Sequence, residues 1–409
     1  LPLICSSFTL SRKRNSPLTR TIVLTTRWYG IKCTLMIKKI GKKLLLTTLV
    51  IIGLLAVGDF IFTAFYPSFG GDVSKERQQA YTASAQYDKG VFINTNSAVP
   101  KTRSFTELMS LLKYSLTTEV QNGRPKEDLP VQKIDSAAVA NYTGPARLVW
   151  YGHSSFLLQM EGKNILLDPM LSEVAAPHPW LAEPRFNSEY PLDIPELPVI
   201  DAVFFSHDHY DHLDYDTVLQ LKAKTKQFYV PLGVGVHLEA WGVPSTQITE
   251  MDWWQETTIG TITVACTPAQ HFSGRKLNNG QSTLWSSWVL HTDRERIFFS
   301  GDSGYAPHFK KIGDTYGPFD LALMECGQYD AKWPEIHMMP EETAQAGVDI
   351  QAKRLMPIHW AGFKLALHPW TDPVLRVQKG AANKDLTIIT SGIGEVISVK
   401  DSTQVYQEW

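Results

Sequence analysis

Several common signatures are missing from this chain, and each absence narrows its chemistry. Only four cysteines occur, and their spacing matches no cysteine-based metal site. Cys266 and Cys326 lie in apolar runs and are predicted to be buried thiols, with a disulfide between them as the alternative. No glycine pattern of the Walker or dinucleotide-binding type is present. Ser154 and Ser155 follow a histidine but lack the nucleophile-elbow pattern, which argues against a serine nucleophile.

Acidic residues are also missing from residues 1–58, which contain ten Lys or Arg. The rest of the chain therefore carries 29 basic against 41 acidic side chains. A binder of the phosphate backbone normally displays a basic surface. We therefore expect no nucleic acid as a partner.

An apolar segment from Leu44 to Tyr66 is long enough to span a bilayer, which takes about 20 residues. A lysine cluster precedes it, so the positive-inside rule predicts a single-pass anchor with a cytoplasmic N-terminus and the catalytic part on the outer side. Asp59 interrupts the segment, and Ala56 to Gly58 would serve as a cleavage site. A signal peptide is therefore the alternative, although the aromatic end of the segment favours a retained anchor. The lysines of the cluster are Lys38, Lys39, Lys42 and Lys43.

Four regions are expected along the chain. Residues 1–35 begin with Leu and do not resemble a targeting signal, whereas Met36-Ile37-Lys38-Lys39 is how a bacterial membrane protein commonly starts. We therefore expect translation to begin at Met36, with 36–66 as basic start and anchor. Residues 67–140 form a connector with a short amphipathic helix at 105–116, which is expected to pack on the body rather than on the membrane. Residues 141–409 form the catalytic domain.

The densest chemical pattern is the run from His207 to His212, which holds three imidazoles and two carboxylates directly after the apolar residues 202–205. Imidazole and carboxylate together suit zinc and its first-row neighbours. All these side chains can turn inward only where a strand passes into a tight loop. The pattern predicts part of a two-metal site at a strand end, with a surface cluster without chemistry as the alternative.

More donors are needed, because a dinuclear site takes about six to eight protein ligands. His271, Asp302 and His359 each follow an apolar run that is typical of a strand. Loops at strand ends commonly converge on one site in layered α/β folds. We therefore expect four separate strands to deliver ligands to one place.

This set resembles the metallo-β-lactamase-fold hydrolases, whose signature is His-x-His-x-Asp-His followed by a later His, Asp and His. The resemblance implies an α/β (α+β) fold, a four-layer αββα sandwich of two mixed sheets, and two zinc ions, with other first-row divalent metals as the alternative. An aspartate at the bridging position argues against a β-lactamase proper. Asp168, at the end of an early strand, would orient a ligand from behind. The implied ligands are His207, His209 and His271 for one metal, Asp211, His212 and His359 for the other, and Asp302 between them.

Within this superfamily, residues 145–375 resemble the branch of N-acyl-phosphatidylethanolamine phospholipase D and its bacterial relatives, and the neighbouring L-ascorbate-6-phosphate lactonase type. The element His337-Met338-Met339-Pro340-Glu341-Glu342 points to the phospholipase branch, where the matching histidine lies near the scissile phosphate. An ordinary loop histidine before a helix at Pro340 is the alternative. His153, expected on the first strand, either lines the site or is a structural imidazole. Trp333 and Trp360 flank site residues and are candidates to line an acyl groove.

The ligand set predicts hydrolysis by a metal-activated hydroxide, with Asp211 and Asp302 as catalytic residues. The resemblance implies His337 as a third catalytic residue, a contact or proton donor on the leaving side. Metals alone do not choose between phosphodiesters, lactones and other esters, since each develops negative charge on oxygen. The resemblance favours a phosphoric diester hydrolase of phospholipase D type acting on a membrane phospholipid. The rivals are a lactonase or small-ester hydrolase and a non-catalytic metal-binding membrane protein. The oligomeric state stays open.

Secondary-structure signals place these motifs. Residues 147–158 and 164–167 are predicted to form a hairpin. A helix is expected at 216–224, with Asp214 or Asp216 as its cap. Further strands are predicted at 228–230, 247–250, 261–266 and 285–291.

Overall fold

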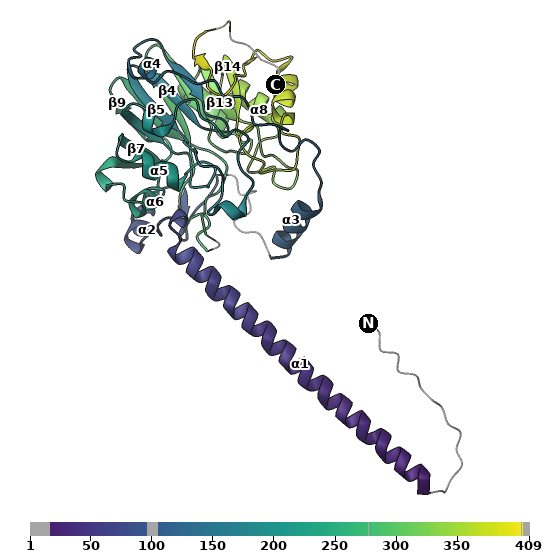
Figure 1. Cartoon of the computed structure of the whole chain (residues 1–409). Coiled ribbons are helices and arrows are strands. Elements are labelled where there is room, and N and C mark those ends of the chain that lie inside the picture. Colours follow the sequence, from purple (N-terminus) through teal and green to yellow (C-terminus); the bar gives the residue numbers. More distant parts are fainter. Residues whose placement is uncertain (1–16, 96–104, 277, 402, 404–409) are drawn as a thin grey trace. The chain divides into compact units, whose positions relative to one another are not determined.

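The computed structural model describes residues 17–95, 105–276, 278–401 and 403 (Figure 1). They divide into two compact units, one ending at Tyr66 and a body starting at Pro67. The first unit is the helix α1 (Pro17–Phe65). Its portion Thr34–Phe65 contains an 18-residue stretch with a mean hydropathy of 2.4 and is long and apolar enough to cross a membrane by length and composition. Residues 1–16 of the expected leader lie outside the described residues, and the start at Met36 stays a prediction.

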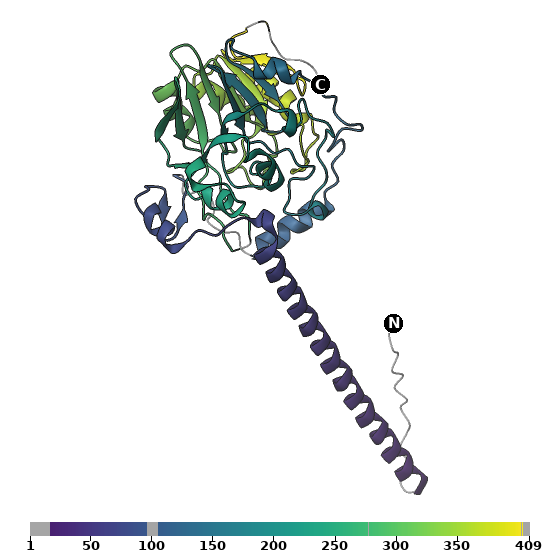
Figure 2. The ribbon, with the colours of Figure 1, turned by 60° about the vertical axis from the view of Figure 1, so that its left-hand side comes forward.

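The body is built on two seven-stranded mixed sheets (Figures 1 and 2). The first sheet has the order β16-β3-β4-β5-β6-β7-β8, and the second has the order β15-β14-β13-β12-β11-β10-β9. In each sheet one half is antiparallel and the other half, β5 to β8 or β12 to β15, is parallel. The strands of the first sheet are β3 (Arg147–Trp150), β4 (Phe156–Met160), β5 (Lys163–Leu167), β6 (Ile200–Phe204), β7 (Thr225–Pro231), β8 (Ile248–Met251) and β16 (Val396–Ser398). Those of the second are β9 (Glu256–Ile259), β10 (Ile262–Thr267), β11 (Ser287–His291), β12 (Arg296–Phe299), β13 (Leu321–Glu325), β14 (Arg354–Ile358) and β15 (Thr387–Ile388).

Helices cover the outer face of each sheet. α4 (Ser136–Ala140), α5 (Tyr215–Leu221) and α6 (Gly235–Ala240) pack on the first sheet, while α7 (His308–Tyr316), α8 (Pro340–Asp349) and α9 (Asp372–Ala381) contribute to the core around the second. The predicted four-layer αββα sandwich is thereby confirmed. The remaining elements are α2 (Lys75–Tyr81), α3 (Phe105–Thr117), β1 (Tyr87–Asp88), β2 (Val91–Phe92), η1 (Pro67–Phe69), η2 (Pro179–Leu181), η3 (Ile194–Glu196) and η4 (Ser245–Gln247).

Strand β6 shows why this sequence builds a central strand with both faces covered. Ala202 and Phe204 belong to the core between the sheets, whereas Val203 and Phe205 pack with the helices outside. Successive side chains of a strand point to opposite faces, so a continuous apolar run buries both. The polar run from Ser206 then begins where the strand ends, and β6 delivers it to the sheet edge.

One detail differs from the sequence prediction, and two agree. The predicted first strand is broken by a turn at 151–155 into β3 and β4, so that β3, β4 and β5 form a meander rather than one hairpin. Asp214 caps α5 by accepting a hydrogen bond from the amide of Thr217, as predicted. Cys266 and Cys326 are buried free thiols, also as predicted.

The predicted helix in the connector is confirmed as α3, and it contacts the body. The hydroxyl of Tyr114 donates a hydrogen bond of 3.0 Å to a carboxylate oxygen of Asp330, and the amine of Lys332 lies over the Tyr114 ring. This contact agrees with packing on the body.

Candidate metal centre

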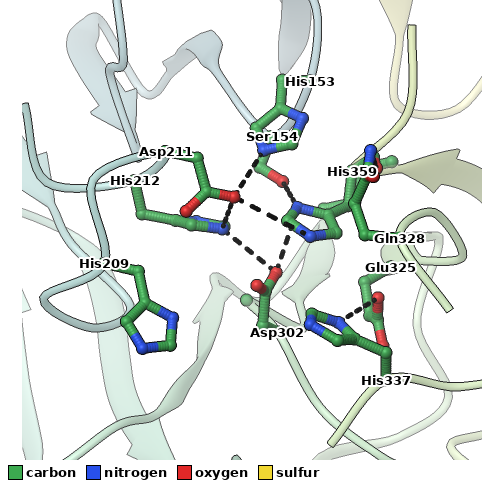
Figure 3. Close-up of polar contacts among 12 residues, drawn as sticks. His153, Ser154, His209, Asp211, His212, Asp302, Glu325, Gln328, His337 and His359 are labelled. Carbon is green, nitrogen blue, oxygen red and sulfur yellow. Dashed lines mark hydrogen bonds and ion pairs between the residues drawn. The ribbon is translucent and has the colours of Figure 1, made fainter. Parts of the chain in front are cut away.

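The predicted ligands meet at one edge of the sandwich, at the carboxyl ends of strands from both sheets. The run from His207 to His212 follows β6, His271 follows β10, Asp302 follows β12 and His359 follows β14 directly. Carboxyl ends of neighbouring parallel strands share one edge, and ligands bind there in open α/β sheets. Figure 3 shows side chains from these loops converging around Asp302.

A first cluster contains His207, His209, His271 and Asp302, whose potential ligand atoms all lie within 4.8 Å of one another. Nδ1 of His209 lies 2.8 Å from Nε2 of His207 and 3.1 Å from Nε2 of His271. Oδ2 of Asp302 lies 3.8 Å from the same two Nε2 atoms. These are the three imidazoles that the sequence assigned to one metal.

The protonation of this cluster fits a cation. Nδ1 of His271 lies 2.9 Å from the carbonyl oxygen of Ile336, which can only accept, so Nδ1 carries the proton and Nε2 keeps its lone pair. Burial lowers the pKa of His207 and His271 well below its ordinary value and that of His209 to about 4. Neutral imidazoles whose nitrogens converge this closely are the form in which histidine binds a metal.

A second cluster contains His153, Asp211, His212 and His359, with their ligand atoms again within 4.8 Å of one another. Oδ2 of Asp211 lies 3.0 Å from Nε2 of His153, 3.5 Å from Nε2 of His212 and 3.9 Å from Nε2 of His359. Nε2 of His212 is buried, and its contacts with the carboxylates of Asp211 and Asp302 lack hydrogen-bond geometry. A buried polar atom without a hydrogen bond is costly unless something else binds it, and a metal ion would do so.

Asp302 lies between the two clusters. Its Oδ2 lies toward His207 and His271. Its Oδ1 lies 3.1 Å from Nε2 of His212 and 3.2 Å from Nδ1 of His359 (Figure 3). Oδ1 is buried, and neither contact has hydrogen-bond geometry. Burial raises the pKa of Asp302 to about 6. One carboxylate with an oxygen toward each cluster has the arrangement of a bridging ligand, and the donor set therefore fits two cations.

A glycine makes the approach of Asp302 to this position feasible. Gly301 has φ +55°, and a Cβ on it would lie 2.6 Å from the Cβ of Ser206 and 2.8 Å from the carbonyl oxygen of Ser286. No larger residue fits there without displacing backbone, and only glycine adopts this φ without cost. Glycine at position 301 is thus required for the chain after β12 to pack against Ser206 and Ser286 and to place Asp302 at this edge.

Asp168 lies behind His212, as predicted for an orienting residue. It is fully buried at the end of β5 and accepts hydrogen bonds from the amide of Ser206 at 2.6 Å and from the Ser206 hydroxyl at 2.5 Å. Its Oδ2 also lies 2.6 Å from Nδ1 of His212. A carboxylate on the far nitrogen fixes the orientation of a ligating imidazole and raises its basicity.

His153 is not on a strand, which corrects the sequence prediction. It lies in the turn between β3 and β4 with φ +53°, and its ring packs 4.3 Å from that of His359, centroid to centroid. Asp168 and His359 also have positive φ, of 37° and 67°. Such strained backbone costs about 1 to 3 kcal/mol per residue and gathers at functional sites. Three such residues in one cluster support a functional role for this edge.

His337 lies in the loop before α8, as predicted, and next to the clusters. Its ring centroid is 5.1 Å from that of His271 and 5.3 Å from that of His359. Its Nδ1 lies 3.3 Å from Oε2 of Glu325, whose Oε1 accepts a 2.7 Å hydrogen bond from the amide of Met338. Burial lowers the pKa of His337 and raises that of Glu325 well above its ordinary value.

Glu325 was missed by the sequence reasoning, although the signal was present. It is the last residue of the apolar strand β13, the same position by which the other ligands were found. Asp302, Glu325, His337 and His359 also form a group whose ligand atoms lie within 4.8 Å of one another. A carboxylate at a strand end should therefore have been included.

The two predicted groove tryptophans occupy different places. Trp333 is half-buried, and its Nε1 donates a 2.9 Å hydrogen bond to the carbonyl oxygen of Gln328. Trp360, the residue after His359, is buried and lines a narrow recess. Other residues that line this recess are Phe186, Gln328, Phe363, Lys364 and Trp370.

Comparisons with known proteins agree with this geometry. A family profile described as a beta-lactamase superfamily domain matches residues 163–360. An uncharacterised protein of Mycobacterium tuberculosis is 38% identical over 365 residues, which are 87% of this chain and 96% of that protein. N-acyl-phosphatidylethanolamine-hydrolyzing phospholipase D 1 of Caenorhabditis elegans is 31% identical over 291 residues, 67% of this chain and 81% of that protein. Outer membrane protein RomA of Klebsiella pneumoniae is 57% identical over 98 residues, 24% of this chain and 74% of that protein.

Proposed function

Because the chain belongs to the β-lactamase superfamily, as a metal-dependent hydrolase of the metallo-β-lactamase fold, we propose that it is a phosphodiesterase of phospholipase D type. Its proposed substrates are N-acyl-phosphatidylethanolamine-like lipids. The observation that carries metal-dependent hydrolysis is the pair of His/Asp clusters on either side of Asp302. The likeness to the C. elegans phospholipase D supports the choice of a lipid phosphodiester.

We propose two zinc ions as the cofactor, bound by the residues of the two clusters. His207, His209 and His271 would hold one ion, Asp211, His212 and His359 the other, and Asp302 would bridge them. When bound, two such cations supply an activated water by lowering its pKa and neutralise charge that develops on the attacked oxygen. Closed structural zinc sites use four ligands for one ion, so a shared carboxylate between two clusters favours catalysis.

His337 is the proposed proton donor to the leaving oxygen. Glu325 contacts its Nδ1, so Nε2 is the atom left to hold a proton toward the substrate. Hydrolysis would break the bond between phosphorus and the oxygen of the N-acylethanolamine, and that oxygen leaves with a proton. His153 and Asp168 would act through their neighbours, by holding Asp211 and His212 in place.

The anchor completes the proposal. We propose that α1 holds the enzyme in a membrane by a single pass, with the N-terminus in the cytoplasm and the body on the outer side. The length and apolarity of Thr34–Phe65, and the lysine cluster that precedes Leu44 within it, support this orientation. A lipid hydrolase held at a bilayer has its substrate in the same membrane.

The test is hydrolysis by the purified, zinc-loaded full chain of three substrates: N-acyl-phosphatidylethanolamine, a generic phosphodiester and a lactone. Phosphodiester cleavage, with N-acylethanolamine as a product, is expected. The variant Asp302→Ala should lose more than about 100-fold in activity and retain fewer zinc ions by elemental analysis, since it removes a ligand of both clusters. The matched control is Asp314→Ala on α7, an exposed residue paired only with Lys310 in the described contacts.

Two results would overturn the proposal. Lactone cleavage without phosphodiester cleavage would assign the lactonase activity instead. Undiminished turnover by the Asp302→Ala variant would refute the site assignment.

A further inference from the structure

The segment Pro67–Phe69, which follows helix α1 and is called the entry segment below, packs in the body. It lies beside the loop Ser206–Leu213, which carries four predicted ligands and is called the metal loop below. Ser68 and Phe69 of η1 are each 6% exposed. The carbonyl oxygen of Ser68 accepts hydrogen bonds from Nε and Nη2 of Arg275 at 2.9 and 2.6 Å. The ring of Phe69 meets that of Tyr210, a residue of the metal loop, edge to face at 6.4 Å. The chain therefore enters the body at a fixed place.

Arg275 connects this segment to the loop that carries the metal ligands. Its Nη1 donates to the carbonyl oxygens of Asp208 at 2.6 Å and Leu213 at 2.8 Å. Arg275 is only 3% exposed, and its guanidinium also lies 4.0 Å from the centroid of the Tyr210 ring. The buried side chain of Arg275 thus binds both the entry segment and two carbonyl oxygens of the metal loop.

The entry segment also makes a hydrogen bond with the loop Pro177–Leu181, which exposes two large apolar side chains. The hydroxyl of Ser68 donates a 2.7 Å hydrogen bond to the carbonyl oxygen of Pro177. Three residues later, in η2, Trp180 is 90% exposed and Leu181 is 60% exposed. Contiguous exposed apolar surface is a feature of protein or membrane interaction sites.

Chain connectivity limits how far this loop can be from a bilayer that holds α1. The helix ends at Phe65, three residues before Ser68. Three residues of extended chain reach at most about 11 Å. Tryptophan is the residue most typical of the membrane interface, where its amphipathic ring sits at the level of the headgroups.

We propose that the loop Pro177–Leu181 inserts Trp180 and Leu181 into the interface of the bilayer that holds α1. The occupant of this surface is lipid. The inference rests on the proposed membrane anchor but not on the proposed phosphodiesterase activity. Ser68 and Arg275 connect this loop to the metal loop. Insertion of the loop into the bilayer would therefore fix which side of the body faces the lipid.

Fluorescence of the full chain in phosphatidylcholine–phosphatidylglycerol vesicles tests this directly. The chain has 12 tryptophans, so the spectrum of the wild type minus that of Trp180→Phe isolates Trp180. We expect this difference signal to be quenched more by lipids brominated near the headgroup than by lipids brominated near the chain ends. Trp254→Phe is the matched control, since Trp254 is half-buried against Tyr316 and should give a difference signal that neither lipid quenches.

The overturning result is a Trp180 signal that an aqueous quencher reaches and neither brominated lipid affects. This readout needs no enzymatic turnover, so it decides the inference even if the proposed activity fails. A chain recovered without α1 would also overturn it, because the loop would then have no anchored bilayer.

Activity supplies a second measurement. The double variant Trp180→Ala, Leu181→Ala should require about tenfold more vesicle substrate for half-maximal rate, since apolar burial at the interface is lost. Its rate on a water-soluble phosphodiester should be unchanged. An equal loss on both substrates would indicate a structural role and refute the inference. Leu375→Ala on α9, a residue 47% exposed, is the control and should affect neither rate.

Discussion

Partners on the far side of each imidazole decide which ring nitrogen faces the centre. The carboxylate of Asp168 meets Nδ1 of His212, and the carbonyl oxygen of Ile336 meets Nδ1 of His271. Both histidines therefore turn Nε2 toward Asp302. The two histidines differ in the charges that surround them, and this difference affects how many protons are released when zinc binds.

Zinc binding to the metal-free protein at pH 7 is expected to release about one proton from His212, besides the proton that the metal-activated water gives up. Burial opposes its charge, but the carboxylates of Asp302, Asp211 and Asp168 outweigh burial and raise the pKa of His212 well above its ordinary value. His212 is therefore protonated before the metal binds, whereas the other ligating imidazoles are already neutral. Zinc affinity should then rise with pH through neutrality and fall below it. Calorimetry in buffers of different ionisation enthalpy counts the protons.

The variant Asp168→Asn is the comparison for this count, because it removes one of the three carboxylates. It should release less than the wild type and bind zinc about 10 to 100 times more weakly. Release of three or more protons by the wild type would show that the other imidazoles are charged, contrary to the expectation.

Glu325 is expected to tolerate replacement by its neutral isostere. Burial raises the pKa of Glu325 well above its ordinary value, so the neutral acid can donate to Nδ1 of His337 while Oε1 accepts from Met338. Glu325→Gln keeps a donor and an acceptor in these places and should retain activity within about tenfold. Glu325→Ala removes both and should lose about 100-fold or more, the usual size of an acid–base contribution. Turnover rates of both variants, at equal zinc content, make the comparison. If Gln is as damaging as Ala, the carboxyl group acts in its charged form.

At the scale of elements, the strands set where the chain reaches the edge of the sheets, and short loops after them carry the ligands. The loop from Ser206 to Leu213 follows β6, and its carbonyl oxygens are held by Arg275 from outside. The turn that carries His153 breaks what was predicted to be one strand. Apolar runs lie on both sides of this turn, and the positive φ of Gly152 and His153, which places the break, is not recorded in the hydrophobic pattern.

Removal of the Arg275 clamp is expected to destabilise the body. Arg275→Met keeps the aliphatic bulk but leaves the carbonyl oxygens of Ser68, Asp208 and Leu213 without their donor. Buried acceptors left unpaired cost about 1 to 3 kcal/mol each, so the free energy of unfolding should fall by about 3 kcal/mol or more. Urea titration measures it. The control Arg294→Ala removes only an exposed pair with Glu161 and should change stability by about 0.5 kcal/mol or less. Equal stabilities of the two variants would refute the clamp.

At the scale of the whole molecule, the two sheets supply each cluster jointly. Asp211 and His212 come from the first sheet, whereas Asp302 and His359 come from the second. Each half therefore lacks a complete ligand set until the sheets pack face to face. The same packing removes the ligating carboxylates and imidazoles from water before a metal binds.

The anchor is expected to keep the full chain in membranes after an alkaline carbonate wash, with the body open to protease added from outside. The apolar stretch Thr34–Phe65 provides the attachment. Leu49→Arg with Ile52→Arg should release the chain from the membrane, since each arginine at the centre of a span costs about 2.5 to 3.5 kcal/mol. Immunoblots of the fractions measure both outcomes. A soluble wild-type body cleaved near Gly58 would instead identify a signal peptide.

The sequence by itself determined the chemistry of the centre. Histidine and aspartate occur at strand ends because apolar runs stop there, and that boundary is visible in one dimension, as for His271 after β10 and Asp302 after β12. Only the tertiary structure decided which atoms face one another. The pairing of Glu325 with His337, the clamp of Arg275 on Ser68, and the exposure of Trp180 join residues that are distant in the chain or depend on what packs against them. Composition and spacing carry no record of such contacts, because burial and pairing are set by the folded neighbours of a residue and not by its neighbours in sequence.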